Sequence, residues 1–303
     1  MFPLLRLMAC CLCFFKFSPH LTLSAQEAQQ APIKTEPSSV VPAPKNSPNA
    51  LVTFTAMGDV PRERADEGLL VRQLADLPSD IEFVVHLGDI KSGSTACDER
   101  TYLKVAGLLA TSRVPVLIIP GDNEWNDCEH PGSAWSLWLK YFSRFERHWE
   151  LEFPFTRFPQ RDELFSFVHG DVLFIGLNLV GGRVHDSLEW KLRLADNAEW
   201  TRLNFRHFGA NAERVVVLGH ATITDNNTDY FSTLVKQAQQ FGKPVLYLHG
   251  DGHRWSKRYP WKAENLLAVQ VDEGSIAPPV QITVTDDETQ PFVFDRRLEL
   301  KQD

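Results

Sequence analysis

From residue 51 onward, short apolar runs alternate with amphipathic stretches. The runs LVTFTAMG, EFVVHLG and VPVLIIPG are separated by helix-like segments near residues 66–77 and 99–110. Apolar runs of this length, bounded by glycine or proline, are typical of strands that are buried on both faces. Their alternation with amphipathic segments predicts βαβ units and a largely parallel sheet, so the expected fold class is α/β.

The second half of the chain continues this pattern and adds a hairpin. ELFSFVHG and DVLFIGLNL follow one another directly, which predicts a pair of neighbouring strands. RVVVLGH and PVLYLHG predict two further core strands. We expect helices near residues 133–149, 187–208 and 230–241, and final strands near residues 266–271, 280–284 and 291–294.

The first 25 residues have the pattern of a secretory signal peptide. Arg6 precedes an apolar run over residues 7–15, and the segment ends in the small residues Ser24 and Ala25 before a polar stretch. A lipid-anchored start at Cys10 is the alternative interpretation. Both predict a secreted or periplasmic protein. The apolar run is too short to cross a bilayer, so we expect no transmembrane helix in the mature chain.

Residues 26–50 form a second distinct segment. They are rich in Pro, Ser, Ala and Gln and contain almost no large apolar residue. Such a segment cannot bury enough surface to order itself, so we interpret it as a flexible linker that is dispensable for activity. Residues 51–303 are then one folded domain, which is long enough for a large core.

The net charge limits the class of partner. The formal charge of the 303-residue chain is −8, and removal of residues 1–25 makes it −10 because two basic and no acidic residues are lost. This balance disfavours binding to a nucleic-acid backbone. An anionic substrate would need a local positive charge to receive it, and no feature of the sequence specifies an oligomeric state.

Cysteine usage agrees with export. Three of the five cysteines lie within residues 1–25, which leaves only Cys97 and Cys128 in the mature chain. A single pair in an oxidising compartment predicts one disulfide, with two free thiols as the alternative.

The informative polar residues come directly after the predicted core strands, where a glycine is followed by an acid or a histidine. They are Asp59, Asp89, Asp122, His220, Asp251 and His253. The carboxyl ends of parallel strands share one edge of a sheet, so these side chains are expected to converge. Clustered carboxylates repel each other unless a cation binds between them. Four carboxylates and two imidazoles can hold two divalent ions that share one aspartate.

These short motifs, in this order, resemble the motifs of the calcineurin-like metallophosphoesterase family. The motifs are Gly58-Asp59, Gly88-Asp89, Gly121-Asp122-Asn123-Glu124, Gly219-His220 and Gly250-Asp251-Gly252-His253. The resemblance extends from about residue 51 to about residue 271. It implies a four-layer α/β/β/α sandwich of the metallophosphoesterase type with a two-metal site.

The resemblance also implies metal-binding roles. Asp59 and His253 correspond to ligands of the first metal, Asp89 to the bridging carboxylate, and His220 to a ligand of the second metal. Two further oxygen ligands replace other residue types. Asp122 stands where the family has an asparagine, and Asp251 stands where it has a histidine.

Two positions depart from the family pattern more severely. Pro61 replaces a histidine ligand of the first metal, and Asn123 replaces the histidine that helps to protonate the leaving group. Glu124 and His185 are candidate replacements for that acid, and Arg183 and Asn123 are candidate substrate contacts. Because nitrogen ligands decrease and oxygen ligands increase, Mn²⁺, Mg²⁺ or Ca²⁺ is favoured, although Zn²⁺ and iron remain compatible.

The function that the resemblance implies is metal-dependent hydrolysis of a small phosphoester or phosphoanhydride. The altered residues motivate a rival hypothesis, in which the chain is a degenerate phosphoesterase scaffold that binds metal or ligand without turnover. A third hypothesis is a surface-tethered interaction domain that uses the proline-rich linker.

Overall fold

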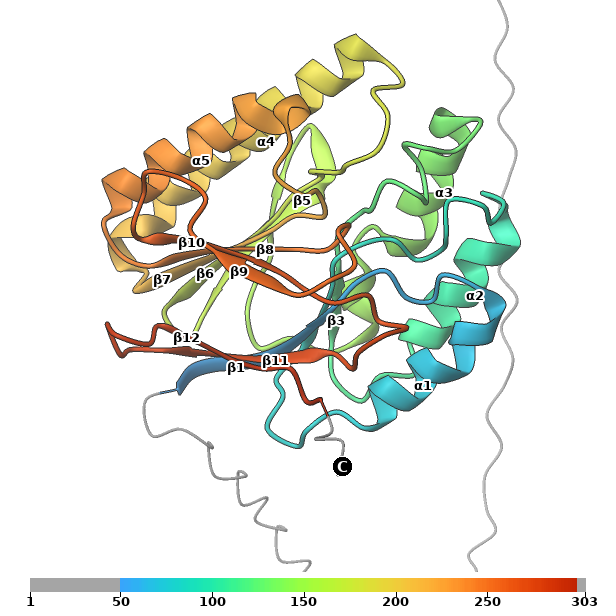
Figure 1. The fold of residues 1–303 in the computed structure, drawn as a ribbon, viewed down its shortest axis with the longest axis horizontal. Coiled ribbons are helices and arrows are strands. Elements are labelled where there is room, and N and C mark those ends of the chain that lie inside the picture. Colours follow the sequence, from blue (N-terminus) through green and yellow to red (C-terminus); the bar gives the residue numbers. More distant parts are fainter. Residues whose placement is uncertain (1–49, 299–303) are drawn as a thin grey trace, which may run out of the picture. The chain divides into compact units, whose positions relative to one another are not determined.

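The computed structural model describes residues 50–298 of the chain (Figure 1). The predicted signal peptide (1–25) and nearly all of the predicted linker (26–50) lie outside the described residues. Within the described part, the chain forms two β-sheets and two groups of helices.

The first sheet contains five strands in the order β12-β11-β1-β2-β3. Its strands are β1 (Ala50–Met57), β2 (Val84–His86), β3 (Val116–Ile118), β11 (Val280–Thr285) and β12 (Phe292–Asp295). Strands β1, β2 and β3 are parallel, whereas β11 pairs antiparallel with both β1 and β12. The parallel half therefore brings the carboxyl ends of three strands to one edge.

The second sheet contains seven strands in the order β4-β5-β6-β7-β8-β10-β9. Its strands are β4 (Thr156–Phe158), β5 (Arg161–His169), β6 (Val172–Gly176), β7 (Arg214–Leu218), β8 (Val245–His249), β9 (Ser256–Arg258) and β10 (Leu266–Gln270). The central strands β6, β7, β8 and β10 are parallel and buried at every position. Full burial explains their nearly continuous apolar sequences.

The helices cover the outer faces of the two sheets (Figure 1). The first group is α1 (Glu67–Ala75), α2 (Glu99–Leu109) and α3 (Pro131–Phe142), which packs on the five-stranded sheet. The second group is α4 (Ser187–Phe208) and α5 (Thr228–Phe241), which packs on the seven-stranded sheet. Four short 3₁₀ turns connect these elements, at Arg64–Asp66, Phe145–His148, Gly209–Asn211 and Asp225–Asn227.

Local sequence explains where individual helices begin and end. The side chain of Asp186 accepts hydrogen bonds from the backbone N–H groups of Leu188 and Glu189, at 2.8 and 3.2 Å, and so caps the start of α4. Helix α5 ends at Gly242, whose φ of 71° is a left-handed conformation that glycine adopts without strain.

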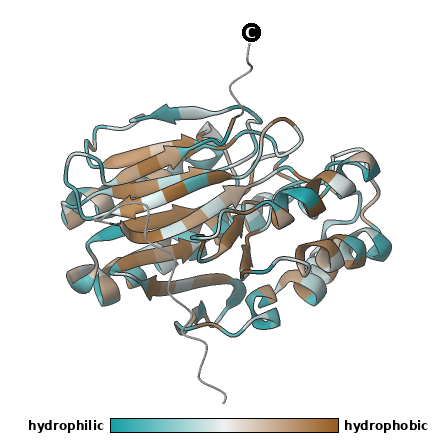
Figure 2. Ribbon diagram, turned by 90° about the horizontal axis from the view of Figure 1, so that it is seen from below, coloured by the Kyte–Doolittle hydropathy of each residue, from teal (hydrophilic) through white to brown (hydrophobic). Residues whose placement is uncertain are grey.

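The two sheets pack face to face through an aromatic core. Phe54 and Phe83 come from the first sheet, and their rings stack with centroids 5.2 Å apart. Phe167 and Phe174 come from the second sheet and stack at 4.7 Å, and the edge of Phe174 meets the ring of Phe54 at 5.5 Å. Truncation of such a buried ring costs about 3–5 kcal/mol of stability. Figure 2 shows the apolar strands of this core enclosed by helices of mixed polarity.

The architecture confirms the predicted α/β class and the α/β/β/α layering. The helix over residues 187–208 and the hairpin of β5 and β6 are found where the sequence predicts them. The expectation of a largely parallel sheet is correct for β1, β2 and β3 and for the central strands of the second sheet, whereas antiparallel strands form one edge of the first sheet and both edges of the second. The helix expected over residues 133–149 ends at Phe142, and the short strands β4 and β9 were not predicted.

Candidate metal centre

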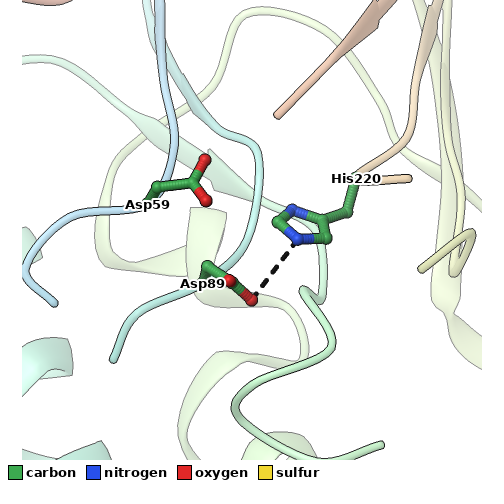
Figure 3. A group of neighbouring side chains, drawn as sticks. All are labelled: Asp59, Asp89 and His220. Carbon is green, nitrogen blue, oxygen red and sulfur yellow. Dashed lines mark ion pairs between the residues drawn. The ribbon is translucent and has the colours of Figure 1, made fainter. Parts of the chain in front are cut away.

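Six polar residues follow the carboxyl ends of core strands. Asp59, Asp89 and Asp122 come after β1, β2 and β3 of the first sheet, whereas His220, Asp251 and His253 come after β7 and β8 of the second. The two edges meet, so residues from both sheets contribute to one site. Figure 3 shows Asp59, Asp89 and His220 directed toward one another, with the ion pair between Asp89 and His220 marked.

The backbone at this site is bent into an unusual conformation. Asp59, Asp89, Asp251 and His253 all have positive φ, at 56°, 59°, 66° and 65°. Non-glycine residues rarely adopt this region, and such strain concentrates at functional sites. Gly88, with φ of 88°, makes the bend possible because a Cβ atom there would overlap the backbone of Gly121. Four of the six side chains are therefore aimed by strained backbone.

Five of the six residues form two overlapping groups, which share His220 and do not include His253. Ligand atoms of Asp59, Asp89 and His220 lie within 4.8 Å of one another, and so do those of Asp122, His220 and Asp251. His220 Nε2 lies 2.9 Å from Asp122 Oδ1 and 3.4 Å from Asp89 Oδ1. These separations between ligand atoms allow several of them to contact one cation.

Three buried atoms that face the site make no hydrogen bond among residues 50–298 outside the group of candidate ligands. They are Asp59 Oδ1, Asp122 Oδ1 and His220 Nε2. The other ring nitrogen of His220, Nδ1, lies 2.7 Å from the carbonyl oxygen of Leu87. A carbonyl can only accept, so Nδ1 carries a proton, and in the neutral imidazole that a metal requires the lone pair of Nε2 faces the site. Buried polar atoms without partners are costly, and a bound cation would satisfy all three.

The electrostatics of the site also fit a cation. Burial raises the pKa of Asp89 well above its ordinary value, and the nearby carboxylates of Asp122 and Glu124 raise it further, against the effect of His220. Burial lowers the pKa of His220, but Asp89 and Asp122 outweigh it, so the pKa of His220 is raised well above its ordinary value. The raised pKa values of Asp89 and His220 both mean that the site favours bound protons. A divalent ion can provide the same positive charge in place of the protons.

The end of the site near His253 is less complete. His253 Nε2 lies 3.1 Å from Asp59 Oδ1, but the side chain is 37% exposed. Arg62 Nη1 lies 2.9 Å from the same nitrogen and 2.9 Å from Glu273 Oε2. Pro61 occupies the position that supplies a histidine in the family pattern and offers no side-chain ligand. The positively charged side chain of Arg62 thus lies at the end of the site where Pro61 leaves one metal ligand missing.

Asn123 and Glu124 are both held by hydrogen bonds. The side-chain amide and the backbone N–H of Asn123 donate to the two carboxylate oxygens of Asp89. Glu124 is fully buried, and its carboxylate accepts hydrogen bonds from the backbone N–H groups of Gly121 and Asp89. These contacts favour an orienting role for Glu124 and place Asn123 against the predicted bridging carboxylate.

The loop with Arg183 and His185 lies beside the segment that carries Asp122. His185 Nδ1 lies 2.9 Å from Asn126 Oδ1, and its ring meets Trp125 edge-on. The exposed Arg183 donates to the carbonyl oxygen of Cys128 at 2.6 Å. The structure therefore brings this loop to the rim of the site, with both side chains engaged by neighbouring protein groups.

Two buried histidines close to the motif glycines have structural partners. His86 Nε2 donates to the carbonyl oxygen of Val60 at 2.6 Å, and the ring of His249 stacks on Tyr247. Burial lowers their pKa to about 4 and about 3, respectively, so both are neutral at pH 7. They are the last residues of β2 and β8 and belong to the packing of the layers.

Several residues near the site were not singled out from the sequence. Arg62 follows Pro61 and lies three residues after Asp59 of the first motif. Thr222 donates through its backbone N–H to Asp251 Oδ2 at 3.2 Å. Asp127 accepts a hydrogen bond from the backbone N–H of Arg183 at 3.0 Å. Each lies a few residues after a motif residue, and this closeness in the sequence is the only feature that could have marked it as part of the site.

Cys97 and Cys128 lie in the loops that follow β2 and β3. Their sulfur atoms are at bonding distance, 1.93 Å, and their Cα atoms are 6.1 Å apart. The backbone separation falls in the normal range for a disulfide. The pairing links the segments that carry Asp89 and Asp122.

Residues 52–255 of this chain match the model of the calcineurin-like phosphoesterase family. The chain belongs to this family. No curated protein matches the chain with significance.

Two solved structures share the fold. A dimetal phosphatase from Danio rerio superposes with a TM-score of 0.58 and 14% sequence identity, covering 81% of this chain and 99% of the phosphatase. A 5'-nucleotidase from Candida albicans superposes with a TM-score of 0.50 and 12% identity, covering 83% of this chain and 52% of the nucleotidase. The chain thus corresponds to about half of the nucleotidase. Within residues 50–298, no helix has both the length and the apolar character that a membrane span requires.

Proposed function

We propose that this protein is an exported, metal-dependent hydrolase of small phosphoester or phosphoanhydride substrates. The observation that carries the proposal is the convergence of potential ligands from two sheets. Three of them, Asp59, Asp122 and His220, present buried atoms that make no hydrogen bond among residues 50–298 outside this group of ligands. Membership of the calcineurin-like phosphoesterase family supports it, as does the shared fold with a phosphatase and a nucleotidase. Export rests on the signal-like sequence of residues 1–25.

The better-formed metal position consists of Asp89, Asp122, His220 and Asp251. It offers three carboxylates and one imidazole, a set that suits Mn²⁺ or Mg²⁺ and also accommodates Zn²⁺. A second position would use Asp59, Asp89 and His253 and would bind more weakly because Pro61 removes one ligand. When bound, a divalent ion neutralises phosphate oxygens and lowers the pKa of a coordinated water.

The residues of the chain itself would orient the site and the substrate. Asn123 and Glu124 fix the bridging carboxylate and its loop through the hydrogen bonds described above. His185 and Arg183 border the site and are the proposed contacts to the substrate. The hydrolysis would break a P–O bond, add water to phosphorus and leave the proton with the departing oxygen.

The rival proposal is a scaffold that binds metal or phosphate without turnover. The observation that favours it is the pair of substitutions Pro61 and Asn123, which remove a metal ligand and the usual proton donor. An enzyme and a scaffold would both bind metal, so only turnover distinguishes them.

The test begins with metal analysis of the purified mature protein. Phosphomonoesters, phosphodiesters and nucleotides are then assayed with added Mn²⁺, Mg²⁺, Ca²⁺ or Zn²⁺. We expect turnover that Asp89→Asn abolishes. The matched control Asp286→Asn removes an acid from an exposed turn and should leave the activity unchanged. Bound metal without turnover of any substrate would favour the scaffold, and turnover that persists in Asp89→Asn would contradict the proposed site.

A further inference from the structure

Arg62 occupies the less complete end of the metal centre. Its Nη1 atom lies 2.9 Å from Nε2 and 3.2 Å from Nδ1 of His253. The same atom donates to Glu273 Oε2 at 2.9 Å, in an ion pair whose side chains are 25% and 15% exposed. Nε2 of His253 is also the nitrogen that faces Asp59. The guanidinium therefore lies at the ligand atom that a second metal ion would need.

A guanidinium at this point disfavours a second divalent ion. It is permanently charged, so it repels a cation at the adjacent position at every accessible pH. This position has also lost a ligand, because Pro61 has no side-chain donor. Within residues 50–298, His253 belongs to neither of the two groups whose ligand atoms lie within 4.8 Å of one another. This end of the site thus fits a second metal ion poorly, whereas Asp122, His220 and Asp251 lie close enough together to contact one ion.

Arg62 also faces space that a ligand can enter. It lines a cavity of about 380 Å³ that borders the side of Arg62 away from the candidate metal ligands, none of which lines it. The wall of this cavity includes five basic side chains and three acidic ones; the basic ones are Arg62, Arg64, Lys91, Arg100 and Lys104. The excess of positive charge suits an anionic group. A guanidinium presents parallel N–H donors that match the oxygens of a phosphate.

We infer that Arg62 replaces the second metal ion, so that the protein binds one ion tightly and uses the guanidinium to bind a phosphoryl oxygen. The inference rests on the proposed phosphoesterase function for the identity of the anion. It explains how the chain retains a positive site for phosphate although Pro61 removes a metal ligand.

The first test is metal stoichiometry, which does not depend on turnover. Metal-free wild-type protein is titrated with Mn²⁺, and bound metal is measured by elemental analysis and by the electron paramagnetic resonance spectrum of Mn²⁺. We expect one tightly bound ion with the signal of an isolated Mn²⁺ centre. Arg62→Met should bind a second ion at lower Mn²⁺ concentration than the wild type, with spin coupling between the two.

The second test is the binding of inorganic phosphate to the Mn²⁺-loaded protein by calorimetry. We expect Arg62→Met to weaken binding by about tenfold or more, because a charge-assisted contact to phosphate is lost. Arg62→Lys keeps the charge but not the paired donors, so it should retain the single-ion stoichiometry and bind phosphate with intermediate affinity.

The matched control is Arg202→Met, which removes an arginine that pairs with Glu199 on the exposed surface of α4. It makes the same change in charge away from the site and should alter neither measurement. Two tightly bound ions in the wild type would overturn the inference, as would unchanged phosphate affinity in a folded Arg62→Met variant. A wild-type protein that binds no ion would instead contradict the proposed metal-dependent function.

Discussion

The carboxylate of Asp122 and the imidazole of His220 lie 2.9 Å apart, although they belong to different sheets. Asp122 follows β3 and His220 follows β7. Both side chains are buried, and the two facing atoms, Asp122 Oδ1 and His220 Nε2, make no other hydrogen bond among the described residues. This contact joins the two halves of the fold at the metal centre, so loss of either side chain should affect metal binding more than stability.

The ligand set predicts how the metal preference responds to substitution. Asp122→Asn and Asp251→His restore the residue types of the family pattern, which lowers the negative charge and adds a nitrogen ligand. We expect the double variant to shift the ratio of Zn²⁺ to Mn²⁺ affinity toward Zn²⁺ by about tenfold or more relative to wild type. Competitive metal titration measures this ratio. A ratio that stays the same or moves toward Mn²⁺ would contradict the assigned ligands.

Asn123 predicts a strong dependence of the rate on the leaving group. Because no histidine stands at this position to protonate the leaving oxygen, alkyl phosphates should react far more slowly than 4-nitrophenyl phosphate. Asn123→His should accelerate alkyl phosphates by about 10² to 10⁴ and change the nitrophenyl ester little, since that leaving group needs no proton. The nitrophenyl ester is the matched control. Similar wild-type rates for both substrates would show that another group already supplies the proton.

The contact of Cys97 with Cys128 predicts a disulfide in protein purified under oxidising conditions. The bond closes a segment with a sequence separation of 31 residues. On a chain-entropy estimate it stabilises the fold by about 3 to 4 kcal/mol. Cys128→Ser should lower the free energy of unfolding by a comparable amount under oxidising conditions and by much less in reductant. Two thiols that react in the unfolded, unreduced wild-type protein would exclude the bond.

His86 predicts a specific loss of stability in acid. Burial lowers its pKa from 6.5 to about 4, so the unfolded chain binds the proton more readily than the folded protein does. Stability should therefore fall as the pH drops below 6.5, until the pH reaches about 4. Between pH 7 and pH 5 this residue should account for about 2 kcal/mol.

The measurement compares metal-free wild type with His86→Gln by urea unfolding at both pH values. The variant keeps a donor for the carbonyl oxygen of Val60 but does not titrate, and the other acidic and histidine groups contribute equally to both proteins. The variant should lose about 2 kcal/mol less than wild type. Equal losses would mean that His86 is not held neutral by burial.

The sequence by itself determined the order and type of most core elements. Runs such as VVVL in β7 and VLYL in β8 are almost entirely apolar, and a strand buried on both faces has that pattern. The six potential ligands were also predictable, because each follows a glycine at the end of such a strand. The rule that parallel strands end at one edge then brings their side chains together.

Tertiary structure decided which strands join the edges of the sheets in the antiparallel direction. The strand β9 (Ser256–Arg258) has a polar sequence with no period that marks it, and it exists because it pairs with β10. The residues 143 and 144 lie past the end of α3, where the chain turns into the 3₁₀ segment Phe145–His148. Strand pairing and helix ends of this kind depend on neighbours that are distant in the sequence.

The position of Arg62 also depended on tertiary structure. In the sequence it is one of many charged residues, and its neighbours give no sign of a partner. Its contacts with His253 and Glu273 span 191 and 211 residues, respectively. Local patterns identify which residues can bind a metal, because strand ends follow from short-range hydrophobicity. The charged side chain that neighbours each ligand is decided only when the two sheets pack, because it is brought there by contacts between segments that are distant in the sequence.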